Sequence, residues 1–289
     1  MLAEKDIIYR ADPHRPSPAR LVGVQPLAPE HALFQFRFED PKENERWTHR
    51  PGQFVMVSVV GTGEAPISIC SSPSRRGVIE LCVRNTGRVT SALHRLKEGA
   101  IVGLRGPYGN GYPVEKMKGQ DILIVAGGLG MAPLRSLVWY VLDNRSDFGH
   151  VSLLYGTRTP EDVLFKGEIA GLVGRGDLET HLTVDKLVED GQPWPHDVGV
   201  VTGLFKYVKD RVDPTRAYAA VTGPPIMYRF VLRELLALGF GKDRILMSLE
   251  RRMKCGIGKC SHCAVGYKYT CIHGPIFTYW DAMNLPEMI

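Results

Sequence analysis

The chain has 289 residues, of which 44 % are hydrophobic and 23 % are charged, and its net charge is +5. This length suits two domains with a small appendage. The mild charge and the lack of a long lysine or arginine run argue against a nucleic-acid-binding protein, and no stretch approaches about 18 uninterrupted apolar residues, which argues against a membrane span.

The N-terminal region shows no targeting pattern. Met1 to Asp6 lack the basic-then-apolar order of a secretory signal. Four of the six cysteines cluster near the C-terminus, which fits a reducing compartment. We therefore expect a cytoplasmic protein. Pro13 and Pro16 predict an extended N-terminal arm over residues 1–17.

Residues 18–115 predict short strands separated by turns. Pro51-Gly52 and Arg76-Gly77 are among the turn signals between them. The expected strands are Arg20–Val24, Leu33–Phe38, Gln53–Val59, Ile67–Cys70, Val78–Arg84 and Ala100–Leu104. One short helix is expected at Ser91–Leu96. Six strands with this spacing predict a small antiparallel β-barrel.

Residues 116–248 alternate strands with helices. The expected strands are Asp121–Ala126, His150–Tyr155, Glu179–Val184, Ala217–Val221 and Ile245–Ser248. Helices are expected after the first strand to about Leu142, at Pro160–Gly171, and after Pro225 through Leu238. This alternation predicts a doubly wound α/β domain with a parallel sheet.

Two loops in this domain join a strand to a helix. The first is Gly127-Gly-Leu-Gly-Met-Ala-Pro133, and the second is Thr222-Gly-Pro-Pro-Ile-Met227. Glycines in such a loop let a dinucleotide phosphate reach backbone N–H groups at a helix N-terminus. The first loop lacks the G-x-G-x-x-G spacing, so alone it is equally well explained as a tight connection. Two such loops at the carboxyl ends of one sheet favour a ligand crevice.

Residues 249–289 carry the most specific pattern of the chain. The cysteines Cys255, Cys260, Cys263 and Cys271 have the spacing C-x4-C-x2-C-x7-C. Its first two intervals match those of plant-type [2Fe–2S] ferredoxins. Gly256 lies in the first interval, where a glycine tolerates positive φ and lets N–H groups approach sulfur. We therefore predict a small C-terminal iron–sulfur lobe.

Other interpretations of the cysteines stay open. Four thiolates could hold zinc in a closed tetrahedral site, although the long glycine-containing interval suits a cluster loop better. Two disulfides are disfavoured because nothing indicates export, and His262 is disfavoured as a ligand because Cys271 completes an all-cysteine set. The aromatic segment Ile276–Trp280 either packs the lobe onto the rest or docks on a partner, and packing is favoured.

Several motifs together resemble the ferredoxin–NADP reductase superfamily. Gly127–Pro133, Tyr155-Gly-Thr-Arg158 and Thr222–Met227 resemble its nicotinamide-binding motifs. Ala65-Pro-Ile-Ser68 and Gly87-Arg-Val-Thr-Ser91 resemble its two flavin motifs, and Gly106-Pro-Tyr-Gly109 resembles the turn that ends its barrel. With the cysteine loop, the pattern is similar to the gamma subunits of soluble NAD(P)-linked nickel–iron hydrogenases, to the related subunit of anaerobic sulfite reductases, and to the electron-transfer subunit of class 1B dihydroorotate dehydrogenase.

The resemblance implies three cofactors: FAD, NAD(P)H and a [2Fe–2S] cluster. Ser68 is the implied catalytic residue, as a hydrogen-bond partner of flavin N5. The implied flavin contacts are Ala65, Pro66, Ile67, Ser68, Cys82, Val83, Arg84, Gly87, Val89, Thr90 and Ser91. The implied nicotinamide contacts are Gly127, Gly128, Gly130, Met131, Ala132, Pro133, Arg158, Thr222, Gly223, Pro224 and Met227. The implied metal ligands are the four lobe cysteines.

Some of these residues have a plainer interpretation. Cys82 is better explained as a small core residue, and Arg158 is equally a cap on the following loop. Ala65 and Ile67 stand where the superfamily often has Arg and Tyr, so other groups, such as Arg84 or Arg88, must help to hold the flavin. Arg158 and Arg135 are both candidates to read a 2′-phosphate.

The resemblance implies an electron-transfer subunit of a larger oxidoreductase, with partner redox subunits that supply the remaining chemistry. A hydrogenase gamma-type role is the first expectation. A sulfite reductase, heterodisulfide reductase or dihydroorotate dehydrogenase complex is the alternative. A zinc-containing nucleotide sensor is the rival from a different class.

Overall fold

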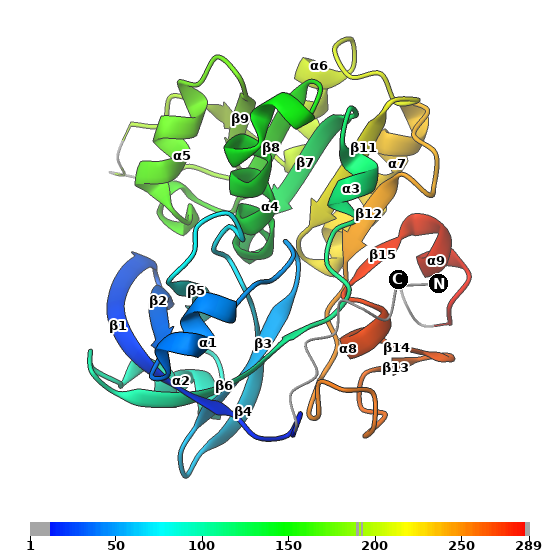
Figure 1. Ribbon diagram of the computed structural model, residues 1–289. Helices are drawn as coiled ribbons and strands as arrows, with labels where there is room; N and C mark the ends of the chain where they lie inside the picture. Colours follow the sequence, from blue (N-terminus) through cyan, green and yellow to red (C-terminus); the bar gives the residue numbers. More distant parts are fainter. Residues whose placement is uncertain (1–11, 189–190, 192, 287–289) are drawn as a thin grey trace.

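The computed structural model describes residues 12–188, 191 and 193–286. It contains an antiparallel barrel, a domain built on a parallel sheet, and a small C-terminal lobe beside the barrel (Figure 1). Most of the predicted arm, residues 1–11, lies outside the described residues. The first strand already begins at Ser17, within the range predicted for the arm.

The barrel has six antiparallel strands in the order β4-β3-β6-β1-β2-β5. They are β1 Ser17–Ala28, β2 His31–Phe38, β3 Phe54–Val59, β4 Gly63–Ser68, β5 Ile79–Arg84 and β6 Ile101–Tyr108. A bridge between Ile69 and Leu81 closes the sheet into a barrel. Alternate side chains such as Phe34, Phe36 and Val55 fill its interior. The predicted antiparallel barrel is confirmed.

Strands β1 and β6 are longer than predicted, and three further elements of the barrel differ from the prediction. The expected strand Ile67–Cys70 is β4, Gly63–Ser68, because a tight turn with Thr62 N–H bonded to Val59 O starts the pairing earlier. The expected helix Ser91–Leu96 is α2, Arg88–His94. Helix α1, Pro41–Arg46, was not predicted, although Asp40 caps it and proline opens it.

The second domain has a seven-stranded sheet in the order β10-β9-β8-β7-β11-β12-β15. Its strands are β7 Asp121–Gly127, β8 Val151–Thr157, β9 Glu179–Val184, β10 Asp197–Val198, β11 Ala217–Thr222 and β12 Ile245–Ser248, with β15 Ile276–Thr278 at the edge. Its helices are α3 Val114–Met117, α4 Met131–Asp143, α5 Lys166–Val173, α6 Phe205–Val208 and α7 Pro225–Ala237. Short 3₁₀ turns occupy Gly128–Gly130, Arg145–Asp147, Pro160–Asp162 and Val201–Leu204.

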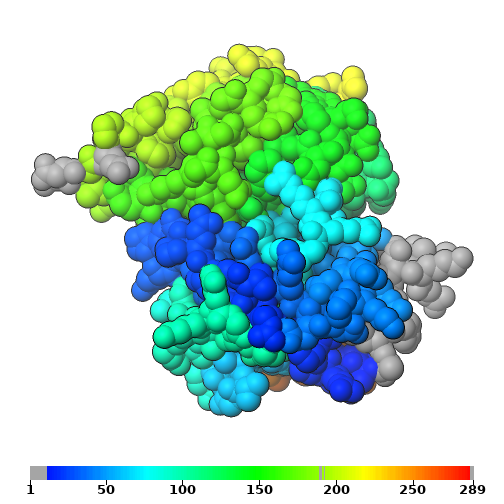
Figure 2. Space-filling model, turned by 60° about the vertical axis from the view of Figure 1, so that its left-hand side comes forward, coloured from blue at the N-terminus to red at the C-terminus, as the bar shows by residue number. Residues whose placement is uncertain are grey.

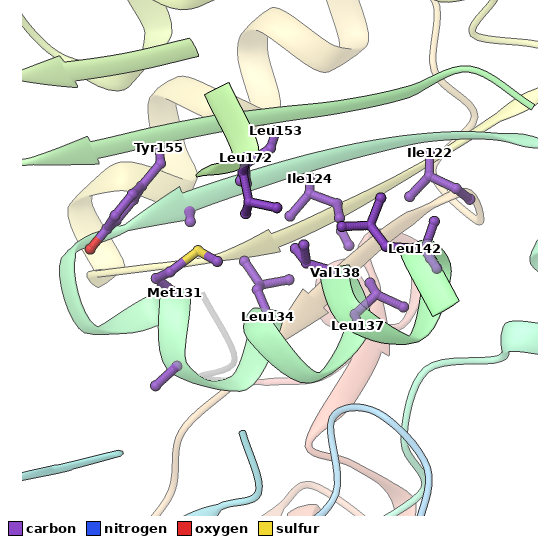
Figure 3. Packing of buried hydrophobic residues seen from close by; sticks show 14 of the residues in the cluster. Ile122, Ile124, Met131, Leu134, Leu137, Val138, Leu142, Leu153, Tyr155 and Leu172 are labelled. Atoms are coloured by element: carbon purple, nitrogen blue, oxygen red, sulfur yellow. The ribbon is translucent and has the colours of Figure 1, made fainter. Parts of the chain in front are cut away.

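Helix α4 packs on the centre of this sheet. Met131, Leu134 and Val138 recur at helical spacing, are all buried, and point toward side chains such as Ile124 on β7 and Leu153 on β8 (Figure 3). This packing fixes the helix that follows the first glycine loop. Strands β7 to β9, β11 and β12 run parallel, as predicted.

Helix α5 is shorter than expected. The prediction began it at Pro160, but a 3₁₀ turn capped by Thr159 and Asp162 comes first. Phe165 then adopts φ +55°, in the left-handed region, so the α-helix begins at Lys166.

The C-terminal lobe contains β13 Ala264–Val265, β14 Lys268–Tyr269, α8 Thr270–His273 and α9 Tyr279–Met283. Strand β15 leaves the lobe and pairs antiparallel with β12, so the chain end extends the neighbouring sheet. Ile276 and Phe277 are buried there, which confirms the packing expected of this segment, whereas Trp280 is 59 % exposed. No helix in the described part of the chain is long and apolar enough to cross a bilayer.

Candidate functional site: two glycine loops, a flavin-type strand and a cysteine loop

The two glycine loops meet at the switch point of the parallel sheet. Strands β7 and β11 are neighbours, with Thr222 beside Ala126, and the next strands lie on opposite sides of this pair. The carboxyl ends of two such strands form the crevice in which open α/β sheets bind ligands. The structure therefore brings the two predicted nicotinamide segments together.

These loop positions require glycine because the two loops approach each other too closely for a Cβ atom. A Cβ on Gly130 would collide with the carbonyl oxygen of Thr222 and lie 2.9 Å from the nitrogen of Gly223. A Cβ on Gly127 would collide with Met227 and lie 3.1 Å from Pro224 Cδ. By contrast, no described atom lies within 4 Å of a Cβ placed on Gly128, so that face of the first loop is open.

The side chains that follow the first loop are buried and pack inside the domain. Met131, Ala132 and Pro133 are buried in the first turn of α4. The hydroxyl of Tyr155 donates to the carbonyl of Gly128 at 3.2 Å and accepts from the N–H of Leu164 at 3.1 Å. These residues shape the loop, and the backbone of the loop is what remains for a ligand.

Two polar side chains flank this crevice. Thr222 is buried at the end of β11, and its hydroxyl lies 3.4 Å from the hydroxyl of Tyr112, which comes from the segment joining the domains. Arg158 follows β8 and its side chain is exposed. Arg158 is thus accessible to a ligand at the carboxyl edge of the sheet.

The predicted flavin strand is the terminal strand in the order of the barrel sheet. Ala65, Pro66, Ile67 and Ser68 belong to β4 and are each half-buried. Proline is tolerated there because β4 is hydrogen-bonded to a neighbouring strand only on the β3 side over this stretch. The placement leaves these side chains partly accessible, as a cofactor-contacting strand requires.

The second flavin motif begins α2. Thr90 is used to cap this helix: its hydroxyl accepts from the N–H groups of Thr86 at 3.1 Å and Gly87 at 2.9 Å. The hydroxyl of Ser91 donates to Asn85 at 2.6 Å. The hydroxyls of Thr90 and Ser91, which the sequence suggested for phosphate contacts, are therefore already hydrogen-bonded to neighbouring residues. Val89 is half-buried against the barrel core.

Strand β5 alternates between the barrel interior and the domain junction. Val83 is buried inside the barrel, and its carbonyl lies 3.0 Å from Nε2 of His94. Cys82 and Cys70 belong to the core that continues into the parallel-sheet domain. Burial raises the pKa of Cys70 to about 12 and also raises that of Cys82. Arg84 is exposed and pairs with Glu30 at 3.3 Å.

The cysteine loop is organised by backbone N–H groups aimed at sulfur. The N–H groups of Ile257 and Lys259 point at Cys255 Sγ at 3.5 and 3.3 Å. The N–H of Gly258 points at Cys271 Sγ at 3.2 Å. Gly256 and Gly258 have φ of +78° and +71°, as the sequence predicted for a loop of this kind.

The four thiols are neighbours. Cys271 interacts with Cys263 and Cys255, and Cys260 interacts with Cys255. Cys263 and Cys271 are buried, whereas Cys255 and Cys260 are half-buried. Burial raises the pKa of Cys271, and the backbone N–H of His262 lowers the pKa of Cys260. A bound metal would deprotonate such thiols outright.

The four lobe cysteines supply the number and kind of donors that a cluster with two irons takes. Within residues 12–188, 191 and 193–286, no three His, Cys, Asp or Glu side chains are placed to hold one metal ion. A [2Fe–2S] cluster takes two thiolates on each iron, so it does not require three ligands to meet at one point. Nδ1 of His262 lies 3.1 Å from the carbonyl oxygen of Cys260, and the side chain is exposed.

The cysteine loop packs directly on the barrel. Phe54 and Met56 of β3 share a buried cluster with Cys263 and Cys271, and Tyr108 of β6 packs against it. A Cβ on Gly256 would lie 2.8 Å from the ring of Tyr108. This contact between the flavin-type barrel and the lobe was not predicted, because the partners lie far apart in the sequence.

Two buried arginines tie the parts together, and neither was recognised as such in the sequence. Arg105 of β6 forms a double hydrogen bond with Glu64 and contacts the lobe. Arg135 of α4 contacts Glu80 at 2.6 Å and Glu168 at 2.7 Å. Arg135 is only 6 % exposed. It is held by protein carboxylates, so the expectation that it is available for a 2′-phosphate is wrong.

One pocket of about 450 Å³ lies away from all these residues. It is found near the amino ends of β8 and β9, whereas the glycine loops lie at carboxyl ends. Its histidines and Arg175 already have carboxylate partners: His150 and His181 bond to Glu179 at 2.9 and 2.8 Å, and Arg175 bonds to Asp177.

Comparison with known proteins agrees with this division. Residues 19–112 match the oxidoreductase FAD-binding domain family, and residues 124–233 match the oxidoreductase NAD-binding domain family. Residues 250–282 match the iron–sulfur cluster binding domain of dihydroorotate dehydrogenase B. All four lobe cysteines fall within the last match.

Relatives that match most of the chain are subunits of larger enzymes. The chain is 45 % identical to sulfhydrogenase 2 subunit gamma of Pyrococcus furiosus, over 96 % of this chain and 100 % of the relative. It is 42 % identical to sulfhydrogenase 1 subunit gamma of the same organism, over 100 % of both. It is 32 % identical to the probable dihydroorotate dehydrogenase B electron transfer subunit of that organism, over 83 % of this chain and 84 % of the relative.

Solved structures agree on the fold. A chain of the NADH-dependent reduced ferredoxin-NADP oxidoreductase aligns with a TM-score of 0.71 and 22 % identity, over 90 % of this chain and 88 % of that chain. A ferredoxin NADP+ reductase from Neisseria gonorrhoeae aligns with a TM-score of 0.66 and 17 % identity, over 80 % and 97 %. The fold is that of ferredoxin–NADP reductases, and the chain belongs to the family that contains the sulfhydrogenase gamma subunits.

Proposed function

We propose that this chain is the electron-transfer subunit of a multisubunit oxidoreductase, most similar in role to a hydrogenase gamma subunit. It exchanges electrons between NAD(P)H and a partner redox subunit through FAD and a [2Fe–2S] cluster. The observation that carries the proposal is the direct packing of the cysteine loop on the flavin-type barrel. The relatedness to two sulfhydrogenase gamma subunits over nearly the full chain supports the choice of complex.

The proposed parts follow the three family matches. Residues 18–115 bind FAD, residues 116–248 bind NAD(P)H, and residues 249–289 bind the cluster. Bound FAD supplies the exchange between hydride chemistry and single-electron chemistry. The chain's task is to hold the nicotinamide, the flavin and the cluster in line and close together.

The flavin residues have separate proposed tasks. The hydroxyl of Ser68, at the half-buried end of β4, donates to flavin N5. Ala65, Pro66 and Ile67 line the flavin along the same strand, and Cys82 faces it from β5. Backbone groups of Gly87 to Ser91 meet the pyrophosphate, because Thr90 and Ser91 use their own hydroxyls in the cap.

The nicotinamide residues act mainly through their backbone. The first glycine loop presents the open face of Gly128 to the dinucleotide, and the second loop supports it from behind through Met227. The hydroxyl of Thr222 lies near the nicotinamide ring. The exposed Arg158 contacts the adenosine side. Cys255, Cys260, Cys263 and Cys271 hold the cluster.

A second complex is supported by one specific observation. The cysteine lobe matches the cluster domain of dihydroorotate dehydrogenase B, and electron transfer subunits of that enzyme are related to most of this chain. The partner that copurifies from cells separates the two: nickel–iron hydrogenase subunits support the first proposal, and a dihydroorotate-oxidising subunit supports the second. A sulfite or heterodisulfide reductase partner is the third outcome.

We place the complex in the cytoplasm.

Replacing one cluster ligand tests the order of the cofactors. In Cys260→Ser we expect loss of the iron–sulfur absorption and of the EPR signal, with FAD still bound. NAD(P)H should still reduce a two-electron dye, because dye reduction needs only the nicotinamide and flavin sites. His262→Gln is the matched control, since His262 lies inside the cysteine loop but is not proposed as a ligand; it should keep both signals. Loss of dye reduction in Cys260→Ser with FAD still bound would contradict the proposal.

A further inference from the structure

One guanidinium lies between the flavin strand and the cysteine loop. Arg105 of β6 is only 3 % exposed. Its Nε donates to Glu64 Oε1 at 2.9 Å and its Nη2 donates to Glu64 Oε2 at 2.7 Å. Its Nη1 donates to the carbonyl oxygen of Cys255 at 3.0 Å. Every nitrogen of this side chain therefore has a partner, and the partners belong to separate segments.

One end of this bridge adjoins the proposed flavin segment, and the other end is a proposed cluster ligand. Glu64 is the residue before Ala65–Ser68, the segment proposed to line the flavin, and both lie on β4. Cys255 is the first of the four cluster cysteines. The same Nη1 also reaches the hydroxyl of Tyr108, whose ring packs beneath Gly256 of the cluster loop. Arg105 thus connects the strand that carries the flavin segment to the cluster loop.

The charge of Arg105 differs from the other positive charges near the loop. Arg252, Lys254 and Lys259 are exposed, so water and salt screen their effect on the cluster. Arg105 is buried against the loop backbone, where screening is weaker. Its positive charge points toward Cys255, and the negative charge of Glu64 lies on the side away from the cysteine contact.

Cluster potentials depend on nearby charge, on hydrogen bonding and on solvent exposure. We propose that Arg105 is a positioning residue that raises the reduction potential of the lobe's cluster and holds the cluster loop at its distance from the flavin strand, with Glu64 as the counter-charge. This inference rests on the proposed function, since it requires a cluster on the four cysteines. It adds a residue outside the cysteine motif that controls the step from flavin to cluster.

Two substitutions of opposite charge test the idea. In Arg105→Gln, which removes the positive charge, we expect the cluster's midpoint potential to fall in an EPR-monitored redox titration. In Glu64→Gln, which removes the negative charge and leaves the arginine in place, we expect it to rise. A purely structural role would shift both variants in the same direction. Arg20→Gln is the control, because Arg20 forms a comparable double hydrogen bond with Glu39 on the barrel surface, and its midpoint should equal that of the unmodified protein.

Arg105→Lys separates charge from geometry. It keeps the charge but loses the double hydrogen bond, so we expect a midpoint near that of the unmodified protein and slower reduction of the cluster by NAD(P)H. FAD content and dye reduction should stay unchanged in every variant that retains the barrel. If Arg105→Gln fails to fold, the midpoint potential of Glu64→Gln still tests the proposal, because a rise is expected there.

The outcomes distinguish this inference from the proposed function. Iron-loaded variants whose midpoints all equal that of the unmodified protein, or a fall in Glu64→Gln, overturn the role of Arg105 while the electron path stands. Unmodified protein that contains FAD but no iron overturns the proposed function itself.

Discussion

The barrel meets its two neighbours in different ways. The junction with the parallel-sheet domain centres on Arg135, which is shared by two carboxylates, Glu80 and Glu168. The junction with the cysteine lobe centres on Arg105, which has one carboxylate, Glu64, and several backbone or hydroxyl acceptors. Figure 2 shows the first junction from outside, where the green and yellow domain lies above the blue and cyan barrel.

Other polar contacts at each junction show the same difference. At the domain junction, exposed Arg75 pairs with Asp143 at 2.9 Å and stacks 3.9 Å over Trp139. At the lobe junction, the side chain of Asn110 bonds the lobe backbone. Strand β15 in addition ties the lobe to β12 of the parallel sheet. Pairs between arginine and carboxylate therefore dominate the polar contacts of the first junction, whereas the second relies more on side-chain hydrogen bonds to backbone carbonyls. The first junction should respond to pH and to charge removal more than the second.

Removing the shared arginine should have the largest effect. Arg135→Met leaves Glu80 and Glu168 partly buried without their cation, and breaking a buried pair in this way costs about 3–5 kcal/mol. We expect a corresponding fall in the free energy of unfolding, measured with denaturant, and slower reduction of FAD by NAD(P)H. Arg75→Gln is the control: its pair is half-exposed and should cost about 1 kcal/mol or less. Equal losses of unfolding free energy in the two variants would contradict the prediction that the buried Arg135 contributes more than the half-exposed pair of Arg75.

The domain junction should also weaken in mild acid. His49 is buried beneath it, with Nε2 3.0 Å from the carbonyl of Ser71, which also accepts from Ser136 of α4 at 2.7 Å. Burial lowers the pKa of His49 from 6.5 to about 4. Between these values the unfolded chain binds more protons, so stability falls as the pH drops from 6.5 to 4, by about 3 kcal/mol in total.

The His49→Gln variant isolates this contribution. Its amide still offers a donor to Ser71, but it does not titrate. We expect its free energy of unfolding to be flatter between pH 6.5 and 4 than that of the unmodified protein. Parallel pH profiles for the two proteins would show that His49 is not the source of the acid sensitivity.

The lobe junction should weaken when the Asn110 side chain, which clamps the lobe backbone, is removed. The side chain of Asn110 donates to the carbonyls of His273 and Ile276 and accepts from the N–H of Ile276. Asn110→Ala leaves these groups unpaired, at a cost of about 1–3 kcal/mol. We expect faster loss of iron on incubation with a chelator, while dye reduction by NAD(P)H is kept. A matching loss of dye reduction would mean that the clamp supports the whole molecule and not the lobe alone.

The sequence signals that succeeded were local ones. The strand-to-helix glycine loops, the alternating barrel strands and the cysteine spacing each depend on residues within a few positions of one another. The cap of α1 by Asp40 was a signal of the same kind that could have been used. The early start of β4 was missed because Ala65 and Pro66 have weak strand preference, and hairpin pairing placed them there.

The contacts that were missed join distant segments. Arg105 is 41 residues from Glu64 and 150 from Cys255, and Arg135 is 55 from Glu80. A lone arginine in a sequence carries no mark of such a partner, so Arg135 looked available for a ligand. The joining of β15 to β12 was hidden for the same reason, because three residues form too short a strand to predict.

An anaerobic titration with NAD(P)H tests the central claim most directly, with absorbance and EPR followed on the same samples. The account predicts about three electrons taken up per chain, two by FAD and one by a [2Fe–2S] cluster whose EPR signal grows as the flavin absorbance bleaches. Uptake of about two electrons by FAD alone, in protein that contains its full iron, would contradict it, because the cluster would then lie outside the electron path.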